Sequence, residues 1–213
     1  MSLSYIQNSN IYICYMLNKS KYTIVCLCFI INLFSACDLK ENSQIKITKI
    51  VEKKVSEKVV KEIIKKETDT INKINAVTFL KAYGKLNKES VILFKTRLGE
   101  IKIKLYKETP LHRSSFLFLT KTGYFNTTSF HRIVPDFIVQ GGNSDHPITR
   151  KLRMKYNYRI PAEIKPYRKH KYGALAAARQ WENNPNKISS PFEFYLIQDK
   201  RGSHHLDGEH TVF

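Results

Sequence analysis

The chain has 213 residues, of which 42% are hydrophobic and 25% charged, so it has room for one ordinary globular domain with an appendage and not for two domains. Its 36 Lys and Arg residues outnumber its 18 Asp and Glu residues, which gives a formal net charge of +18. The bases are scattered and form no stripe of Arg with interleaved aromatic residues, so we expect no nucleic-acid partner. Nucleic-acid binding stays a remote alternative. The positive charge would also suit an anionic membrane surface.

The cysteines are confined to the beginning of the chain. All four lie within the first 37 residues, at Cys14, Cys26, Cys28 and Cys37. The rest of the chain can therefore hold neither a disulfide framework nor a cysteine-based zinc site. The adjacent His204 and His205 lack the spaced partners of a zinc site, so we expect no metal and no other cofactor.

The N-terminal segment has the pattern of an export signal. Lys19 and Lys21 precede an uncharged, apolar run over residues 22–34, which is too short to cross a bilayer comfortably as a helix. Residues 1–15 contain no charged side chain, whereas a conventional signal begins at Met16. We therefore expect residues 1–36 to be a signal peptide, with Met16 as its true start.

Residues 34–37, with the sequence Phe-Ser-Ala-Cys, resemble the lipobox of bacterial lipoproteins, in which the signal is cut before the cysteine and the thiol carries lipid. The resemblance implies lipidation at Cys37. It also implies a membrane-anchored lipoprotein of the cell envelope that faces the periplasm or the exterior. A simple secretory signal and an uncleaved anchor are the alternatives.

Residues 37–87 are predicted to hold the lipidated cysteine and a charged helical stalk or linker. From Gln44 to about Lys73 the chain lacks Gly and Pro, and apolar residues recur four apart, at Ile47, Val51, Val55, Val59 and Ile63. The two interpretations are a solvated spacer and a dimerising coiled coil. We favour the spacer, and with it a monomer, because the stripe is short of Leu and does not alternate spacings of three and four.

The folded domain opens with the pattern of an antiparallel hairpin. An apolar run over residues 91–94 is followed by a turn at residues 98–100, and Ile101, Ile103 and Leu105 then alternate with polar neighbours. Next, Thr109 and Pro110 supply a cap and a first-turn proline for a helix over residues 111–121, which Gly123 can end.

Residues 129–142, Ser-Phe-His-Arg-Ile-Val-Pro-Asp-Phe-Ile-Val-Gln-Gly-Gly, form two short strand-like runs hinged at the Pro-Asp pair. This segment closely resembles the signature of the cyclophilins, a family of peptidyl-prolyl cis-trans isomerases. Further segments resemble cyclophilin blocks in the same order and spacing, at residues 160–163, 173–179, 190–197 and 205–213. Any one block is weak evidence, but five in one order argue strongly against chance.

The resemblance covers about residues 88–213 and implies a mainly β fold, a closed antiparallel β-barrel with capping helices. Cyclophilin barrels continue beyond the Val-Phe pair at which this sequence ends. We therefore expect the domain to be incomplete at its C-terminus, lacking its final strand and helix and leaving an unpaired sheet edge. The sequence is then either a fragment or the product of a damaged gene, and we favour a truncated or frameshifted reading.

By the same resemblance, Arg132 aligns with the catalytic arginine of the family. A guanidinium is permanently charged and presents several fixed N–H donors, which suits a hydrogen bond to the nitrogen of a twisted prolyl amide. The resemblance implies substrate-binding roles for a further set: a proline pocket of Phe137, Tyr195, Leu206 and His210, a wall of Ala178 and Arg179, and a backbone-bonding partner in Gln140. Core packing is the alternative for the three apolar pocket residues, and we expect His131 to pack in the core.

Three positions depart from the cyclophilin pattern. Glu193 stands where the family usually has glutamine, so we also place it in the substrate site, where its carboxylate can face Arg132 and orient it or compete with substrate for it. His205 replaces a common tryptophan at the rim, which argues against strong cyclosporin binding. Residues 149–159 replace a glycine-rich stretch with five bases, so we expect a stiffer and more cationic loop there.

The function that the resemblance implies is prolyl isomerisation that assists the folding of exported proteins, with proline-containing polypeptides as substrates. One alternative is a non-catalytic module that binds prolyl peptides as a chaperone. Another is a structural lipoprotein of the envelope.

Overall fold

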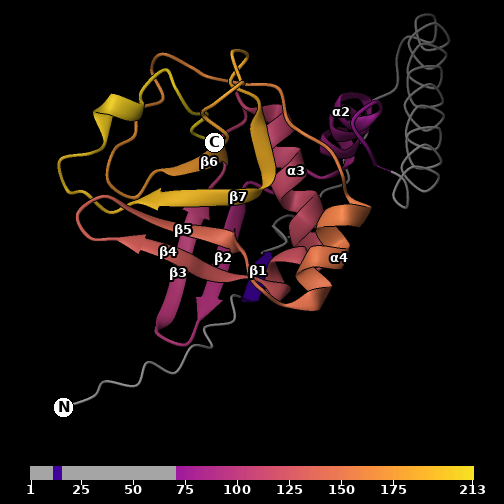
Figure 1. Cartoon of the computed structure of the whole chain (residues 1–213), viewed down its shortest axis with the longest axis horizontal. Coiled ribbons are helices and arrows are strands. Elements are labelled where there is room, and N and C mark those ends of the chain that lie inside the picture. Colours follow the sequence, from indigo (N-terminus) through magenta and orange to yellow (C-terminus); the bar gives the residue numbers. More distant parts are fainter. Residues whose placement is uncertain (1–11, 16–70) are drawn as a thin grey trace, which may run out of the picture.

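Two antiparallel sheets set crosswise form the centre of the computed structural model, which describes residues 12–15 and 71–213 (Figure 1). The first sheet has the strand order β1 (Tyr12–Tyr15), β2 (Val91–Thr96), β3 (Gly99–Lys104). The second has the order β4-β5-β7-β6 and consists of β4 (Ser129–Val134), β5 (Ile138–Asn143), β6 (Leu175–Arg179) and β7 (Ser189–Ile197). The flanking helices are α2 (Ala76–Leu86), α3 (Pro110–Lys121), α4 (Pro147–Lys155) and the short 3-10 turns η1 (Tyr124–Thr127) and η2 (His204–Leu206).

This architecture confirms the mainly β fold class with helices at its sides. Every strand ladder within residues 12–15 and 71–213 belongs to one of the two sheets, so closure into a barrel stays a prediction. Cys37 and the predicted stalk up to residue 70 lie outside the described residues, as does the predicted signal peptide apart from β1. Over the described ranges, no helix has the length and apolar character needed to cross a bilayer.

Strands β2 and β3 form the predicted hairpin, joined by a tight turn at residues 97–98. The alternating pattern places Ile92 and Phe94 in the core, and Ile103 of the partner strand faces the same way. On its other side β2 pairs with β1, with Tyr12 opposite Lys95 and Tyr15 opposite Ile92. Both edges of β2 are therefore paired.

Helix α3 is buried almost along its whole length and occupies the middle of the larger apolar cluster. It begins at Pro110, as the pattern predicts, and Glu163 binds its first turn. The carboxylate of Glu163 accepts hydrogen bonds from the backbone N–H groups of Leu111, at 3.0 Å, and His112, at 2.9 Å. These are N–H groups that a helix cannot satisfy internally, so a negative charge at this end stabilises the helix.

Helix α2 packs against the outer side of α3 (Figure 1). Phe79 is fully buried and meets Phe118 edge to face, with ring centroids 5.1 Å apart. At Gly84 the two helices come so close that a Cβ atom would overlap the hydroxyl of Ser114. The packed unit thus includes residues 71–87, upstream of the boundary at residue 88 that we expected, so these residues are not a free linker.

The cationic loop predicted over residues 149–159 is instead mostly helical, which corrects that prediction. Helix α4 begins at Pro147, where a proline removes no hydrogen bond, and the ring of His146 accepts from the N–H of Ile148. Two of the five bases, Arg153 and Lys155, lie in its last turn, where positive charge suits the helix dipole.

Candidate active site

A row of side chains crosses the second sheet from edge to edge. Arg132 of β4 lies opposite Gln140 of β5, Gln140 lies opposite Tyr195 of β7, and Tyr195 lies opposite Ala176 of β6. Residues directly opposite one another share a face of the sheet. The four strands of this sheet therefore place Arg132, the amide of Gln140 and the predicted pocket residue Tyr195 on one face.

The two faces of this sheet carry different cores because side chains alternate along each strand. Phe192 and Phe194 of β7 belong to the larger cluster around α3. Tyr195 and Ile197 instead belong to a smaller cluster on the opposite face, whose buried members are Ile138, Ala176, Tyr195, Ile197, Leu206 and Val212. The smaller cluster is the floor of the candidate site.

A β-bulge turns Arg132 toward this floor. Phe130 lies opposite Gly141 and packs against the larger core, whereas Arg132 lies opposite Gln140, so His131 is an extra residue in β4. With regular alternation, Arg132 would face the same way as Phe130. The prediction that His131 packs in the core is wrong: its side chain is 24% exposed, with Nε2 3.8 Å from a carboxylate oxygen of Glu193.

The predicted apolar pocket residues meet in the smaller cluster. Tyr195 and Leu206 are buried in it, and Phe137 and Ala178 pack against it half-exposed. His205 stacks on the ring of Phe137, with centroids 5.3 Å apart, and so forms one rim of the site. The structure thus brings these apolar side chains together on one face of the sheet, and we call this surface the apolar slot; it suits a proline ring, which has no N–H to donate.

His210 closes the other side of the slot. Its Nδ1 lies 3.0 Å from the carbonyl oxygen of Ala177, which can only accept, so Nδ1 carries a proton and Nε2 does not. Burial lowers the pKa of His210 to about 4, and the ring is neutral near pH 7. Its edge meets the ring of Tyr195 at 5.5 Å, so a neutral, flat group lines the slot.

The hydroxyl of Tyr195 is hydrogen-bonded to a buried histidine, His170. Asp207 accepts hydrogen bonds from the backbone N–H of His170, at 2.8 Å, and from its Nδ1, at 2.9 Å. The remaining ring nitrogen, Nε2, lies 3.2 Å from the Tyr195 hydroxyl and accepts a hydrogen bond from it. Burial lowers the pKa of His170 and raises the pKa of Tyr195, so both groups stay neutral and this arrangement is fixed near pH 7.

Arg179 is bound by Glu209 and is not free to bind a second anion. Its Nε donates to the backbone oxygen of Glu209 and a terminal nitrogen donates to the carboxylate, both at 2.8 Å. The guanidinium also lies over the ring of Trp181, 4.2 Å from its centroid. Ala178 packs against the smaller cluster, and the guanidinium of Arg179 is engaged by Glu209 and Trp181, so the substrate-wall role of these two residues stays a prediction.

Trp181 is a site residue that the sequence patterns did not reveal. It is the only tryptophan of the chain, 58% exposed, and its ring meets that of His210 edge to face at 5.2 Å. An exposed aromatic side chain beside an apolar slot is a recognised feature of binding surfaces. The sequence feature that could have indicated this residue is a single tryptophan next to a turn-rich segment.

Glu193 does not bond to Arg132 directly. Its Oε2 accepts from the side-chain amide of Gln140, at 3.0 Å, and its Oε1 accepts from Arg153 of α4, at 2.9 Å. Gln140 in turn accepts from Nη1 of Arg132, at 3.2 Å. The expectation that Glu193 faces Arg132 is therefore corrected: the amide of Gln140 lies between them.

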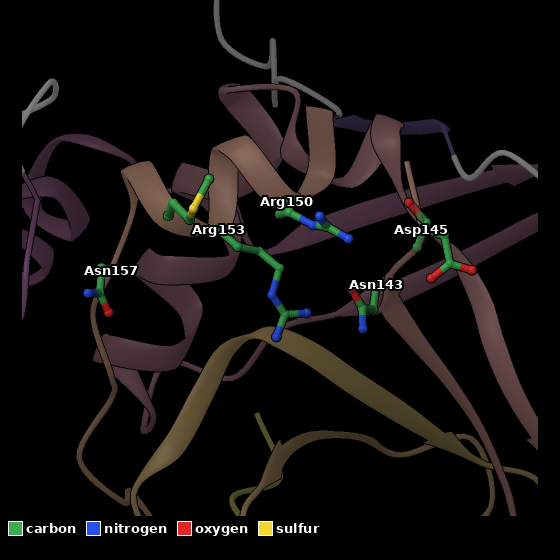
Figure 2. Close-up of a pocket in the computed structure, with 7 residues that line it drawn as sticks. Asn143, Asp145, Arg150, Arg153 and Asn157 are labelled. Atoms are coloured by element: carbon green, nitrogen blue, oxygen red, sulfur yellow. The ribbon is translucent and has the colours of Figure 1, made fainter. Parts of the chain in front are cut away.

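A pocket of about 510 Å³ lies beside this network, between α4 and the segment that follows β5 (Figure 2). Its lining residues are Asn143, Ser144, Asp145, Arg150, Arg153, Met154 and Asn157. In Figure 2, Arg153 extends from α4 toward β7, the strand that carries Glu193. Among the described residues, no cluster of three or more His, Cys, Asp or Glu side chains could hold a metal ion.

A protein-family model matches most of the residues that the structure describes. The family model described as cyclophilin type peptidyl-prolyl cis-trans isomerase/CLD matches residues 91–213. A peptidyl-prolyl cis-trans isomerase-like 3 of Neurospora crassa is 35% identical over 124 residues, covering 55% of this chain and 70% of the relative. A peptidyl-prolyl cis-trans isomerase of Helicobacter pylori is 33% identical over 130 residues, covering 60% of this chain and 73% of the relative.

Among solved structures, the chain is similar to a cyclophilin type peptidyl-prolyl cis-trans isomerase of Cryptosporidium parvum, crystallised in the presence of the dipeptide Ala-Pro. The TM-score is 0.44 and the sequence identity 28%, over 55% of this chain and 72% of the solved one.

Proposed function

This chain belongs to the family of cyclophilin-type peptidyl-prolyl cis-trans isomerases, and we propose that it isomerises Xaa-Pro bonds in exported proteins, with Arg132 as the catalytic residue. The observation that carries the proposal is the common face of the second sheet. On it the guanidinium of Arg132 lies beside an apolar slot whose members include Phe137, Tyr195 and Leu206.

The barrier to rotation is electronic, because the amide nitrogen shares its lone pair with the carbonyl. It amounts to about 18 to 20 kcal/mol, and uncatalysed prolyl exchange takes tens to hundreds of seconds. In the twisted transition state the lone pair returns to nitrogen, which becomes a hydrogen-bond acceptor. A donor directed at that nitrogen stabilises the transition state and neither planar ground state, so it lowers the barrier instead of only tightening binding.

Arg132 supplies that donor. Only one of its N–H groups is engaged by Gln140 in a bond that the structure describes, and the side chain is exposed to an incoming peptide. A charge-assisted hydrogen bond is worth roughly 1.5 to 3 kcal/mol, and about 1.36 kcal/mol corresponds to a factor of ten in rate. Arg132 therefore accounts for about a ten- to a few-hundredfold acceleration.

The slot supplies the rest of the acceleration, because it holds the proline ring while the preceding carbonyl group rotates. Phe137, Leu206 and neutral His210 bind the ring through apolar contacts. No bond to a side chain forms or breaks in this mechanism, so it requires no nucleophile and no proton transfer.

We further propose that the protein is a lipoprotein of the cell envelope, with Cys37 as the lipidated residue. The support is the sequence alone: a basic, then apolar segment followed by Phe-Ser-Ala-Cys at residues 34–37. Cells that express the full chain and are fed a labelled fatty acid should incorporate label into it. Cys37→Ser should abolish incorporation, and a chain of Cys37→Ser that still carries label would refute the assignment.

The isomerase proposal is tested by measuring cis-to-trans conversion of a proline-containing reporter peptide by the full chain. Arg132→Ala should lower kcat/KM about ten- to a hundredfold, while Arg97→Ala, which removes an exposed arginine from the β2–β3 turn, should not change it. Peptide binding without any acceleration by the folded wild-type chain would favour the chaperone alternative instead.

A further inference from the structure

Three polar contacts connect helix α4 to the candidate catalytic residue. Arg153 donates to Glu193 at 2.9 Å, Gln140 donates to the second oxygen of the same carboxylate at 3.0 Å, and Arg132 donates to Gln140 at 3.2 Å. We propose that Arg153 and Glu193 are positioning residues, which set the orientation of the Gln140 amide and thereby hold the guanidinium of Arg132 toward the slot. The proposal rests on the proposed isomerase function and deepens it.

The carboxylate of Glu193 restricts how the amide of Gln140 can face. A carboxylate only accepts hydrogen bonds, whereas an amide has a donor end and an acceptor end. The NH₂ group of Gln140 must therefore point to Glu193, and its oxygen must point to Arg132. In the flipped orientation, an NH₂ group would face the N–H groups of Arg132 and an oxygen would face the carboxylate, so both contacts would become repulsive.

Arg153 neutralises the negative charge of Glu193, the carboxylate that fixes the orientation of the Gln140 amide. Glu193 is only 20% exposed and has three cationic or titratable neighbours on two elements: Arg153 from α4, and from β4 both His131, at 3.8 Å, and Arg132, beyond the intervening amide. A poorly solvated carboxylate without a close counter-charge attracts whichever cation can reach it. With Arg153 removed, that cation is Arg132, which would turn away from the substrate.

The position of Arg153 is itself well defined. Its guanidinium lies 5.2 Å from the ring centroid of Phe192, so an aromatic face supports it. Its helix is fixed to the domain through Thr149, which is fully buried and donates to the backbone oxygen of Thr127 at 2.7 Å. In Figure 2 the side chain of Arg153 extends from α4 toward β7, so the ion pair joins a helix to a strand.

The experiment compares kcat and KM of the full chain with those of five variants. Arg153→Met, which keeps the length of the side chain and removes its charge, should lower kcat about tenfold and change KM less than about twofold. Arg153→Lys should recover most of the loss. Lys151→Met, at an exposed position of the same helix, is the matched control and should behave as the wild type.

The decisive comparison is between the double substitution Arg153→Met with Glu193→Gln and Glu193→Gln alone, set beside the effect of Arg153→Met in the wild-type background. Without the carboxylate nothing draws Arg132 away, so the double variant should be several-fold faster than Arg153→Met alone. A merely structural role of Arg153 predicts the opposite, because the loss would then persist in either background. Equal losses in both backgrounds, or an unchanged kcat in Arg153→Met, would overturn the proposal while the isomerase function stands.

A second readout does not require turnover. In ¹⁵N-labelled protein, the side-chain NH₂ signals of Gln140 and the Nε–H signal of Arg132 should shift in Arg153→Met and return toward their original positions in the double variant. If the wild-type chain does not accelerate isomerisation, the proposed function fails, and these signals still decide the contact network. Unmoved signals in Arg153→Met would refute the positioning role.

Discussion

The Nδ1–H of His210 donates to the carbonyl oxygen of Ala177, 3.0 Å away, across the wall of the candidate proline slot. This bond fixes the tautomer of a buried histidine, and burial keeps that ring neutral. The same residue therefore sets the shape of the slot and makes the domain sensitive to acid.

Stability should fall on acidification between about pH 6.5 and pH 4. The pKa of His210 is lowered to about 4 in the folded chain, so the unfolded chain binds the proton first and acid favours unfolding. The contribution of His210 should reach about 1 to 3 kcal/mol and level off below about pH 4, whereas carboxylates with lowered pKa values, such as Asp207, add further losses at lower pH. Urea unfolding followed by the fluorescence of Trp181 measures it. His210→Gln should flatten the profile but not abolish it, because burial also lowers the pKa of His170.

Arg132→Lys should be nearly as inactive as Arg132→Ala, even though it keeps the charge. The ammonium group lacks the fixed fork of donors with which arginine can bond Gln140 and the substrate nitrogen together. We expect kcat/KM to fall about tenfold or more. Full activity of Arg132→Lys would show that charge alone suffices and that the geometry of the guanidinium is unimportant.

Trp181→Ala should weaken the binding of a prolyl peptide by about three- to tenfold. The indole meets His210 and lies under the guanidinium of Arg179, so its removal opens one rim of the slot. Isothermal titration measures the affinity, and Trp181→Phe, which keeps an aromatic ring, is the control. Because the chain has one tryptophan, its fluorescence in the wild type should also change on binding, and an unchanged signal would place the peptide elsewhere.

Gly142→Ala should destabilise the domain by more than about 2 kcal/mol. Gly142 has a φ of 92°, and a Cβ atom there would overlap the backbone oxygen of Phe192 on the neighbouring strand. Gly173→Ala is a matched comparison, because its φ of 77° is also positive but no atom lies within 4 Å of the added carbon. Chemical unfolding should show a clearly smaller loss for Gly173→Ala, of about 1 kcal/mol.

Phe79→Ala should destabilise the domain by about 3 to 5 kcal/mol, because this side chain of α2 is fully buried against Phe118. Ile74→Ala, at a position that is 94% exposed just before the same helix, should change stability by less than about 0.5 kcal/mol. Equal effects in the two variants would show that α2 is not an integral part of the folded unit.

Local patterns in the sequence predicted several elements well. The hairpin of β2 and β3 follows from alternation of apolar and polar residues, and α3 follows from a proline at its start and apolar spacing through its length. Helix α4 was missed because it is short, strongly basic and almost without buried residues, so its sequence has only a narrow apolar face. The packing of α2 was missed because its position depends on contacts with α3, and a local sequence pattern does not specify which helix α2 packs against.

By itself, the sequence determined the family, the order of the main elements and the identity of the candidate catalytic arginine, because a set of motifs in a fixed order carries that information. The tertiary structure decided which way Arg132 points, since one extra residue at His131 reverses the alternation of β4. It also decided that Glu193 is bonded to Gln140 and Arg153 instead of Arg132. The physical reason is the same for both: the direction of a side chain and its polar partner depend on strand register and on residues tens of positions away, which no local pattern specifies.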